Sequence, residues 1–226
     1  MPRNTPAIFW WVVGLSLVGA LVPTVYPELD LRVAALFSGP NGVLSNLNWW
    51  WIQWVNDYIP AVFRVLLGAT AIAWLLLRGE RWKEMRWVLA FFVVAGILGP
   101  GAVVNLGVKD QWNRARPYEV QNFGGTAHFT RAAVITDQCD ANCSFVSGHV
   151  ACGIFLASLA LVHRRRQIIW TGLGVASGGL IGLARMRDMA HWLSDVLWAF
   201  PITLMASWLV WKLMIWIYTR PWRTVG

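Results

Sequence analysis

Long, nearly uninterrupted apolar runs are the feature that most limits how this chain can fold. Several of them approach the roughly 20 residues that a helix needs to cross the hydrocarbon core of a bilayer. Inside lipid the backbone has no water to bind, so each run must satisfy its own N–H and C=O groups, as an α-helix does. We therefore predict an all-α, polytopic membrane protein with six transmembrane helices, at about residues 6–25, 58–77, 87–108, 144–162, 168–184 and 193–218.

The composition supports a membrane protein built as a single domain. Hydrophobic residues make up 57% of the chain and charged residues 13%, whereas a soluble domain has about 25% charged residues. Tryptophans gather in the segment 49–54, as they do at membrane–water interfaces. We expect residues 1–226 to form one integral membrane domain.

The basic residues bear on topology and on partners. A formal net charge of +8 would suggest nucleic acid in a soluble protein. Here Arg3, the loop 78–86, the run 164–166 and the tail residues Arg220 and Arg223 lie between or beyond the apolar runs. The positive-inside rule places these segments, and with them both termini, in the cytoplasm. We expect the lipid bilayer and no nucleic acid as partners, and the oligomeric state stays open.

The three cysteines do not form a metal-binding pattern. Cys139 and Cys143 flank a short polar turn, Cys152 lies in an apolar run, and no neighbouring His or Cys completes a zinc set. If the turn faces an oxidising compartment, we expect a disulfide between Cys139 and Cys143. We predict no metal and no cofactor, and we interpret Cys152 as a packing residue.

Three short polar segments carry most of the residues capable of chemistry. We call them island 1 (residues 109–117), island 2 (residues 144–149) and island 3 (residues 184–195). With six crossings, all three lie on the membrane face opposite the termini. Their basic residues therefore need a reason other than topology.

Island 1 contains a pair of cations that can hold an anion. Lys109 and Arg116 are about two helical turns apart, although Pro117 disfavours a helical conformation at Arg116. Lysine offers a point charge and arginine a planar fork that matches phosphate oxygens. The alternative is that both side chains snorkel to lipid headgroups.

Island 2 places Ser147, Gly148 and His149 at the start of an apolar helix. Small residues leave the first backbone N–H groups accessible, and the partial positive charge of a helix N-terminus favours phosphate. His149 can give or take a proton near neutral pH. The alternative is a helix cap with an incidental histidine.

Island 3 combines Arg185 with His191 and Asp195, which are spaced i,i+4 and so share one helix face. A carboxylate that binds one imidazole nitrogen leaves the other nitrogen able to attack or to transfer a proton. An aspartate at the mouth of a membrane helix is costly unless it has a partner. The alternative is a structural His–Asp pair within the bundle.

The order and spacing of the islands resemble the type 2 phosphatidic acid phosphatase (PAP2) superfamily of membrane lipid phosphatases. Its pattern is Lys-x6-Arg-Pro, then Pro-Ser-Gly-His, then Ser-Arg-x5-His-x3-Asp, and the resemblance covers the four C-terminal crossings. The chain departs from this pattern at Val146, where the family has proline, and at Ala184, where it has serine. The first departure concerns loop stiffness and the second removes one hydrogen bond to phosphate. The resemblance implies a PAP2-type helical bundle.

The resemblance also implies a role for each matching residue. His191 attacks phosphorus and becomes a phosphohistidine, with Asp195 orienting it. His149 protonates the leaving oxygen and then activates water. The family needs no metal. The phosphate oxygens are held by Lys109, Arg116, Arg185, the Ser147 side chain and the Gly148 amide.

Bacterial members of this family act on phosphates of lipid A, on undecaprenyl pyrophosphate or on phosphatidylglycerol phosphate. The form Cys-x3-Cys-Ser-Phe-Val-Ser-Gly-His looks most like the lipid A phosphatase branch. We therefore expect a lipid A phosphate as substrate, at a site facing the periplasm from a bacterial inner membrane, with undecaprenyl pyrophosphate second. Four further residues contact the rest of a headgroup or are solvated at the interface: Arg114, His128, Arg131 and Arg187.

Two other functions fit the same residues. A phosphotransferase would pass phosphate from the phosphohistidine to a second lipid, and its first half-reaction is the same. A lipid-binding or scaffold protein would keep the fold without the reaction, although the intact catalytic positions argue against it.

Overall fold

Helices and loops make up the described part of the chain, as the apolar runs predict. The computed structural model describes residues 4–39 and 49–219, apart from the side chain of Asp110. Within these ranges there is no strand, and one bridge between Val120 and Ala127 stands alone. The predicted all-α class is confirmed.

The helices follow one another with short 3₁₀ and π segments between them. The α-helices are α1 (Ala7–Val25), α2 (Glu28–Ala35), α3 (Trp50–Leu76), α4 (Lys83–Gly96), α5 (Asp110–Trp112), α6 (Gly148–Ile154), α7 (Gln167–Arg187) and α8 (Leu193–Thr219). The π-helix is η2 (Ile97–Lys109), and the 3₁₀ helices are η1 (Glu80–Trp82), η3 (Pro117–Glu119), η4 (Gln121–Phe123), η5 (Phe155–Leu161) and η6 (Arg164–Arg166). Because α4 runs directly into η2 and α6 into η5, each pair forms one continuous helix.

Five helical segments of the described chain are long and apolar enough to cross a membrane. They correspond to the predicted first, second, third, fifth and last crossings. Their bounds are Ala7–Val25, Trp50–Leu76, Glu80–Lys109, Arg164–Arg187 and Leu193–Thr219. The second crossing begins earlier than predicted, since the tryptophan-rich segment after residue 49 is already helical.

The predicted fourth crossing, residues 144–162, differs from the other five. It forms a shorter apolar helix, Gly148–Leu161, that tightens from α to 3₁₀ geometry at Phe155. Nearly all of its residues are buried, because other helices pack around it. A helix enclosed by protein need not match the bilayer thickness as a lipid-facing helix must. The count of six full-length spans is therefore not confirmed in the described residues.

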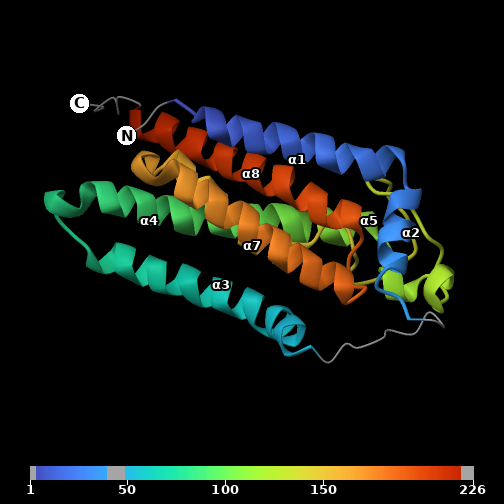
Figure 1. Cartoon of the computed structure of the whole chain (residues 1–226). Helices are drawn as coiled ribbons and strands as arrows, with labels where there is room; N and C mark the ends of the chain where they lie inside the picture. Colours follow the sequence, from blue (N-terminus) through green and yellow to red (C-terminus); the bar gives the residue numbers. More distant parts are fainter. Residues whose placement is uncertain (1–3, 40–48, 220–226) are drawn as a thin grey trace.

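The helices run side by side, and α2 and α5 lie together at one end of the bundle (Figure 1). α1 packs along α8, whereas α3 lies on the far side of the bundle from α1 (Figure 1). The end that carries α2 and α5 also holds the start of α3, the end of α7 and the start of α8 (Figure 1). Islands 1 and 3 thus come to the same end, and island 2 joins them there through the contact of Ser144 with His191.

α7 packs closely on the buried helix because glycine allows the two backbones to approach. A Cβ atom added at Gly174 would lie 2.3 Å from the backbone nitrogen of Ala157, a distance that real Cβ contacts do not show. At Gly172, on the same helix, a Cβ atom would meet nothing within 4 Å. Close approach through small residues is a common way for membrane helices to associate.

We expect the substitution Gly174→Ala to destabilise the folded protein by about 1–3 kcal/mol, because the new methyl group forces α7 away from the buried helix. Gly172→Ala is the matched control on the same helix, and it should leave stability unchanged or raise it by up to about 1 kcal/mol. Thermal unfolding of the detergent-solubilised protein, followed by circular dichroism, compares the two. Equal unfolding temperatures would show that the close approach does not matter.

Candidate active site

His191 lies between α7 and α8 in an orientation that leaves one ring nitrogen available for attack. The side chain is 1% exposed. Its Nδ1 atom lies 2.8 Å from the backbone carbonyl oxygen of Ser144. A carbonyl can only accept, so Nδ1 carries the proton and Nε2 keeps its lone pair. Asp195 Oδ2 is 3.7 Å from Nδ1, which is too long for a hydrogen bond.

The sequence suggested that Asp195 fixes the tautomer of His191. In the structure the backbone carbonyl of Ser144 accepts the hydrogen bond from Nδ1 and fixes the tautomer instead. Asp195 lies behind the ring at ion-pair distance. There it can stabilise positive charge that develops on the imidazole when Nε2 forms a bond.

Burial lowers the pKa of His191 to about 3, with smaller contributions in the same direction from Arg185 and Arg116 and an opposing one from Asp195. The imidazole is therefore neutral near neutral pH, the state that a nucleophile requires. The two arginines act on this ring although one belongs to island 1 and the other to island 3, so the structure brings both islands close to His191.

We expect the ring of His191 to stay neutral between about pH 5 and pH 8. In the unfolded chain this histidine would titrate near 6.5, so below that pH the unfolded state binds a proton that the folded state excludes. The contribution to stability is complete above pH 6.5 and is lost as the pH falls toward 3. Histidine-labelled NMR, with the signal assigned by a His191→Gln variant, tests this. A His191 signal that titrates near pH 6.5 would contradict it.

Asp195 is held by a fully buried set of donors. It accepts hydrogen bonds from the Ser144 hydroxyl and from the backbone N–H of Trp192, the latter at 2.9 Å. Arg114 Nη1 donates to its other oxygen at 2.5 Å, and both side chains are 0% exposed. The carboxylate thus has a charged partner inside the protein, as a buried aspartate requires.

Arg114 is a buried structural residue rather than the headgroup contact considered from the sequence. Its guanidinium also donates to Asp30 Oδ2 at 2.7 Å, to Ser194 Oγ at 2.8 Å and to the carbonyl of Thr130 at 2.9 Å. Burial raises the pKa of Asp30, and Arg114 opposes that shift. One arginine therefore links two carboxylates from α2 and α8. Asp30 was not identified from the sequence, because only folding brings α2 next to Arg114.

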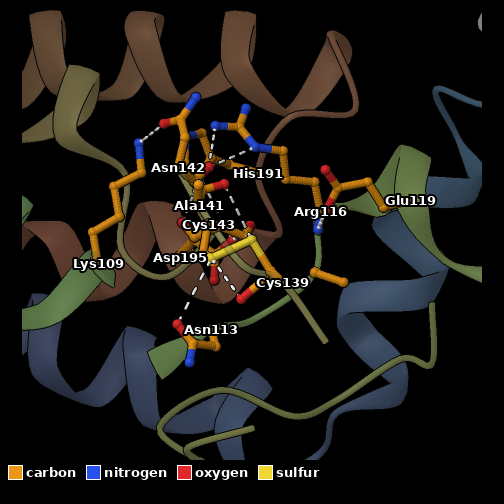
Figure 2. The surroundings of a disulfide bond; sticks show 12 residues. Lys109, Asn113, Arg116, Glu119, Cys139, Ala141, Asn142, Cys143, His191 and Asp195 are labelled. Carbon is orange, nitrogen blue, oxygen red and sulfur yellow. Dashed lines mark hydrogen bonds and ion pairs between the residues drawn. A yellow bond between two sulfur atoms is a disulfide. The ribbon is translucent and has the colours of Figure 1, made fainter. Parts of the chain in front are cut away.

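Island 1 and the cysteine loop meet at one residue, Asn142 (Figure 2). The Nη2 and Nε atoms of Arg116 donate to its backbone carbonyl at 2.6 and 3.1 Å, and Lys109 Nζ donates to its side-chain oxygen. Asn142 lies within the loop closed by a disulfide between Cys139 and Cys143, which was expected from the sequence. Lys109 and Arg116 are thus brought together on the two oxygens of Asn142.

Island 2 begins α6 as the sequence indicated. Ser147 precedes the first helical residue, and its buried hydroxyl has no hydrogen-bond partner among the described residues. A Cβ atom at Gly148 would lie 2.6 Å from Asn105 Oδ1, so glycine keeps the helix start compact. The Nε2 atom of His149 lies 3.1 Å from the backbone carbonyl oxygen of Asn56, on α3.

Arg185 is positioned by two neighbours and retains an unused donor. Its Nη1 atom donates to Asn56 Oδ1 and to Asp188 Oδ2, the latter at 3.3 Å. Burial raises the pKa of Asp188, and Arg185 opposes that shift. The Nε atom of Arg185 is buried without a partner in the described part of the chain.

The remaining residues considered for headgroup contacts are exposed or contact another side chain. Arg187 lies over the ring of Trp49 at 4.3 Å from the centroid. His128 and Arg131 have exposed side chains in the connection between islands 1 and 2. Asn56 and Asn142, in contrast, contact several site residues and were not identified from the sequence, since only folding brings them near the islands.

The assembled site has the components needed to bind and attack a tetrahedral anion. It joins a neutral histidine with an available ring nitrogen to a second histidine and three cations. Two of its donors, Ser147 Oγ and Arg185 Nε, are buried without protein partners in the described ranges. Leaving such atoms unpaired is costly, so a bound anion would stabilise them.

Comparison with known proteins identifies the family. Residues 85–218 match the model of the PAP2 superfamily. A lipid A 4'-phosphatase of Francisella tularensis subsp. novicida is 31% identical over 202 residues, covering 84% of this chain and 88% of the relative. A lipid A 4'-phosphatase of Rhizobium leguminosarum is 34% identical over 114 residues, 49% of each chain. No solved structure matches this chain. The protein belongs to the PAP2 superfamily and is a membrane-embedded phosphatase.

Proposed function

We propose that the protein hydrolyses a phosphate of lipid A, with the 4'-phosphate as the preferred position, at the periplasmic face of a bacterial inner membrane. The observation that carries the proposal is the orientation of His191, whose Nδ1 atom is held by the Ser144 carbonyl so that Nε2 keeps its lone pair, in a ring whose pKa is lowered by burial and by the charges of Arg185 and Arg116. The relatives support the substrate class, since their names specify lipid A 4'-phosphate.

The reaction proceeds in two steps through a phosphohistidine. His191 Nε2 attacks phosphorus, and the bond from phosphorus to the lipid oxygen breaks while His149 gives that oxygen a proton. His149 then takes a proton from water, which attacks the phosphohistidine and releases inorganic phosphate. Lys109, Arg116 and Arg185 stabilise the charge on the transferring group.

The charged side chains explain why His191 can carry this intermediate. Once Nε2 is phosphorylated, the imidazole ring is positively charged. Its Nδ1–H still donates to the Ser144 carbonyl, and Asp195 Oδ2 lies 3.7 Å from Nδ1. Arg114 keeps Asp195 in place from the other side. The intermediate is thereby stabilised by a carboxylate that does not need to move.

The distribution of basic segments supports a periplasmic site. The connection between α3 and α4 and the three arginines of η6 lie at the end of the bundle opposite to α2 and α5 (Figure 1). The positive-inside rule places that end in the cytoplasm. The Cys139–Cys143 disulfide at the site end fits an oxidising compartment. Arg3, Arg220 and Arg223, which also entered the topology prediction, lie outside the described residues.

A substrate panel tests the proposal. Purified protein is incubated with lipid A, undecaprenyl pyrophosphate and phosphatidylglycerol phosphate, with and without EDTA, and with a His191→Ala variant as control. We expect phosphate release from lipid A that EDTA does not reduce, with loss at the 4' position seen by mass spectrometry. Preferred release from another lipid would overturn the substrate class. Transfer of phosphate to an added lipid, without release to water, would show a phosphotransferase.

No phosphate release from any lipid above the His191→Ala control would overturn the hydrolase itself. Localisation is tested separately by labelling of single cysteines placed in the connection between α3 and α4 (residues 77–82) and in the segment 121–138. Access from the periplasm to the first of these, and not to the second, would contradict the proposed orientation.

A further inference from the structure

Asn56, on α3, contacts three residues of the site, although the family pattern does not include it. Its backbone carbonyl lies 3.1 Å from His149 Nε2. Its side-chain oxygen accepts from Arg185, and its side-chain nitrogen donates to Asp188 Oδ2 at 2.8 Å. Asn56 lies outside the family match, which covers residues 85–218. One residue of α3 thus joins islands 2 and 3.

The carbonyl of Asn56 is available to His149 because of the residue four positions later. In an α-helix this carbonyl would accept the N–H of residue 60. That residue is Pro60, inside α3, and proline has no N–H. Inside a membrane a carbonyl that loses its helical donor requires another one. The imidazole of His149 provides it.

This contact decides which nitrogen of His149 does the chemistry. Because a carbonyl can only accept, the Nε2 atom of His149 carries a proton and stays on Asn56. The proton that leaves for the substrate oxygen must then come from Nδ1, and Nδ1 must later take the proton from water. The ring is held in one orientation for both steps.

We infer that Asn56 and Pro60 form a positioning pair for the acid–base step, in which Pro60 releases the Asn56 carbonyl to hold His149 by Nε2 so that proton transfer occurs through Nδ1. The Asn56 side chain at the same time fixes Arg185 between its own oxygen and Asp188. The inference rests on the proposed function, since it gives His149 the acid–base role.

The substitution Pro60→Ala tests the backbone contact without removing any side chain from the site. The alanine N–H returns to the helix ladder and competes with His149 for the Asn56 carbonyl. We expect kcat to fall about 10- to 100-fold. KM should not rise, and the unfolding temperature should not fall. Pro23→Ala is the matched control, since Pro23 also lies inside a membrane helix, α1. It should leave kcat unchanged.

The leaving group distinguishes a positioning role from a structural one. A lipid oxygen needs a proton to leave, whereas p-nitrophenolate does not. In single-turnover experiments we expect Pro60→Ala to slow release of the dephosphorylated lipid but not release of p-nitrophenol from p-nitrophenyl phosphate. Equal slowing of both, or no slowing of lipid release relative to Pro23→Ala, would overturn the inference.

A second variant, Asn56→Ala, keeps the backbone carbonyl and removes only the contacts to Arg185 and Asp188. We expect it to raise KM more than it lowers kcat, the reverse of Pro60→Ala. The same pattern in both variants would contradict separate roles for the carbonyl and the side chain. If the proposed function itself is wrong, the outcome differs from both of these, because the wild-type protein would then release no phosphate from any lipid.

Discussion

Replacing Arg114 with methionine is expected to destabilise the protein by about 3–5 kcal/mol, because it leaves buried carboxylates without their cation. Asp30 and Asp195 both lie within 2.7 Å of the guanidinium, and all three side chains are 0% exposed. The guanidinium also stacks over Trp192, at 5.3 Å from the ring centroid. Methionine fills much of the same volume, so the loss reports mainly on the charge and its hydrogen bonds.

The matched control is Arg131→Met, which removes the same side chain at an exposed position and should change stability by no more than about 0.5 kcal/mol. Arg114→Lys should be intermediate, because one ammonium group cannot reproduce the planar fork that reaches several acceptors. Equilibrium unfolding in mixed detergent micelles measures all three. If Arg114→Met unfolds like Arg131→Met, the buried network does not stabilise the fold.

Replacing His191 with alanine is expected to lower kcat by about 10⁴- to 10⁶-fold, the loss found when a covalent nucleophile is removed. In the proposed mechanism the Nε2 atom is the group that bonds to phosphorus. The fold should persist, because Asp195 keeps its bonds to Arg114 and to the Trp192 backbone. Phosphate release and circular dichroism on the same samples separate the two effects.

His163→Ala provides the control for histidine loss in general. His163 lies next to η6, at the opposite end of the bundle, and accepts a hydrogen bond from Trp170 Nε1 at 3.0 Å. Its removal should leave kcat unchanged. His149→Ala should lie between the two, with a loss of about 10²- to 10⁴-fold, since general acid–base catalysis contributes that much. A His191→Ala variant as active as His163→Ala would remove His191 from the mechanism.

The components of the site were predictable from local spacing in the sequence. The interval between Lys109 and Arg116, the Ser147–His149 start of a helix, and the i,i+4 relation of His191 to Asp195 are short-range patterns. The Ser144 carbonyl on His191 Nδ1 joins islands 2 and 3 in the folded chain. The all-α class followed in the same way from the length of the apolar runs, because lipid leaves the backbone few alternatives.

The partners that hold these residues were not predictable, since they come from distant parts of the chain. Asp30 and Asn142 contact the site only because α2 and the disulfide loop fold back over it. Asn56 lies just after the tryptophan-rich segment 49–54, which was interpreted as interfacial. Pro60, four residues later, was the available signal, because a proline inside a membrane helix always leaves one carbonyl in need of a donor.

The fourth crossing shows why apolar length alone does not determine span count. Residues 144–162 are as apolar as a lipid-facing helix, yet they form a shorter helix enclosed by the others. Hydrophobicity does not distinguish contact with lipid from contact with protein. Gly174, which lets α7 approach it, can be read from the sequence, but its close contact with Ala157 cannot.

Trapping of the covalent intermediate tests whether His191 is the nucleophile. Protein is mixed with ³²P-labelled lipid A for a short time, quenched in alkaline detergent and digested. We predict label on the peptide that contains His191, stable in base and lost in acid as a phosphohistidine is, and absent from the His191→Ala variant. Label that persists in that variant, or that maps to a different residue, would contradict the mechanism.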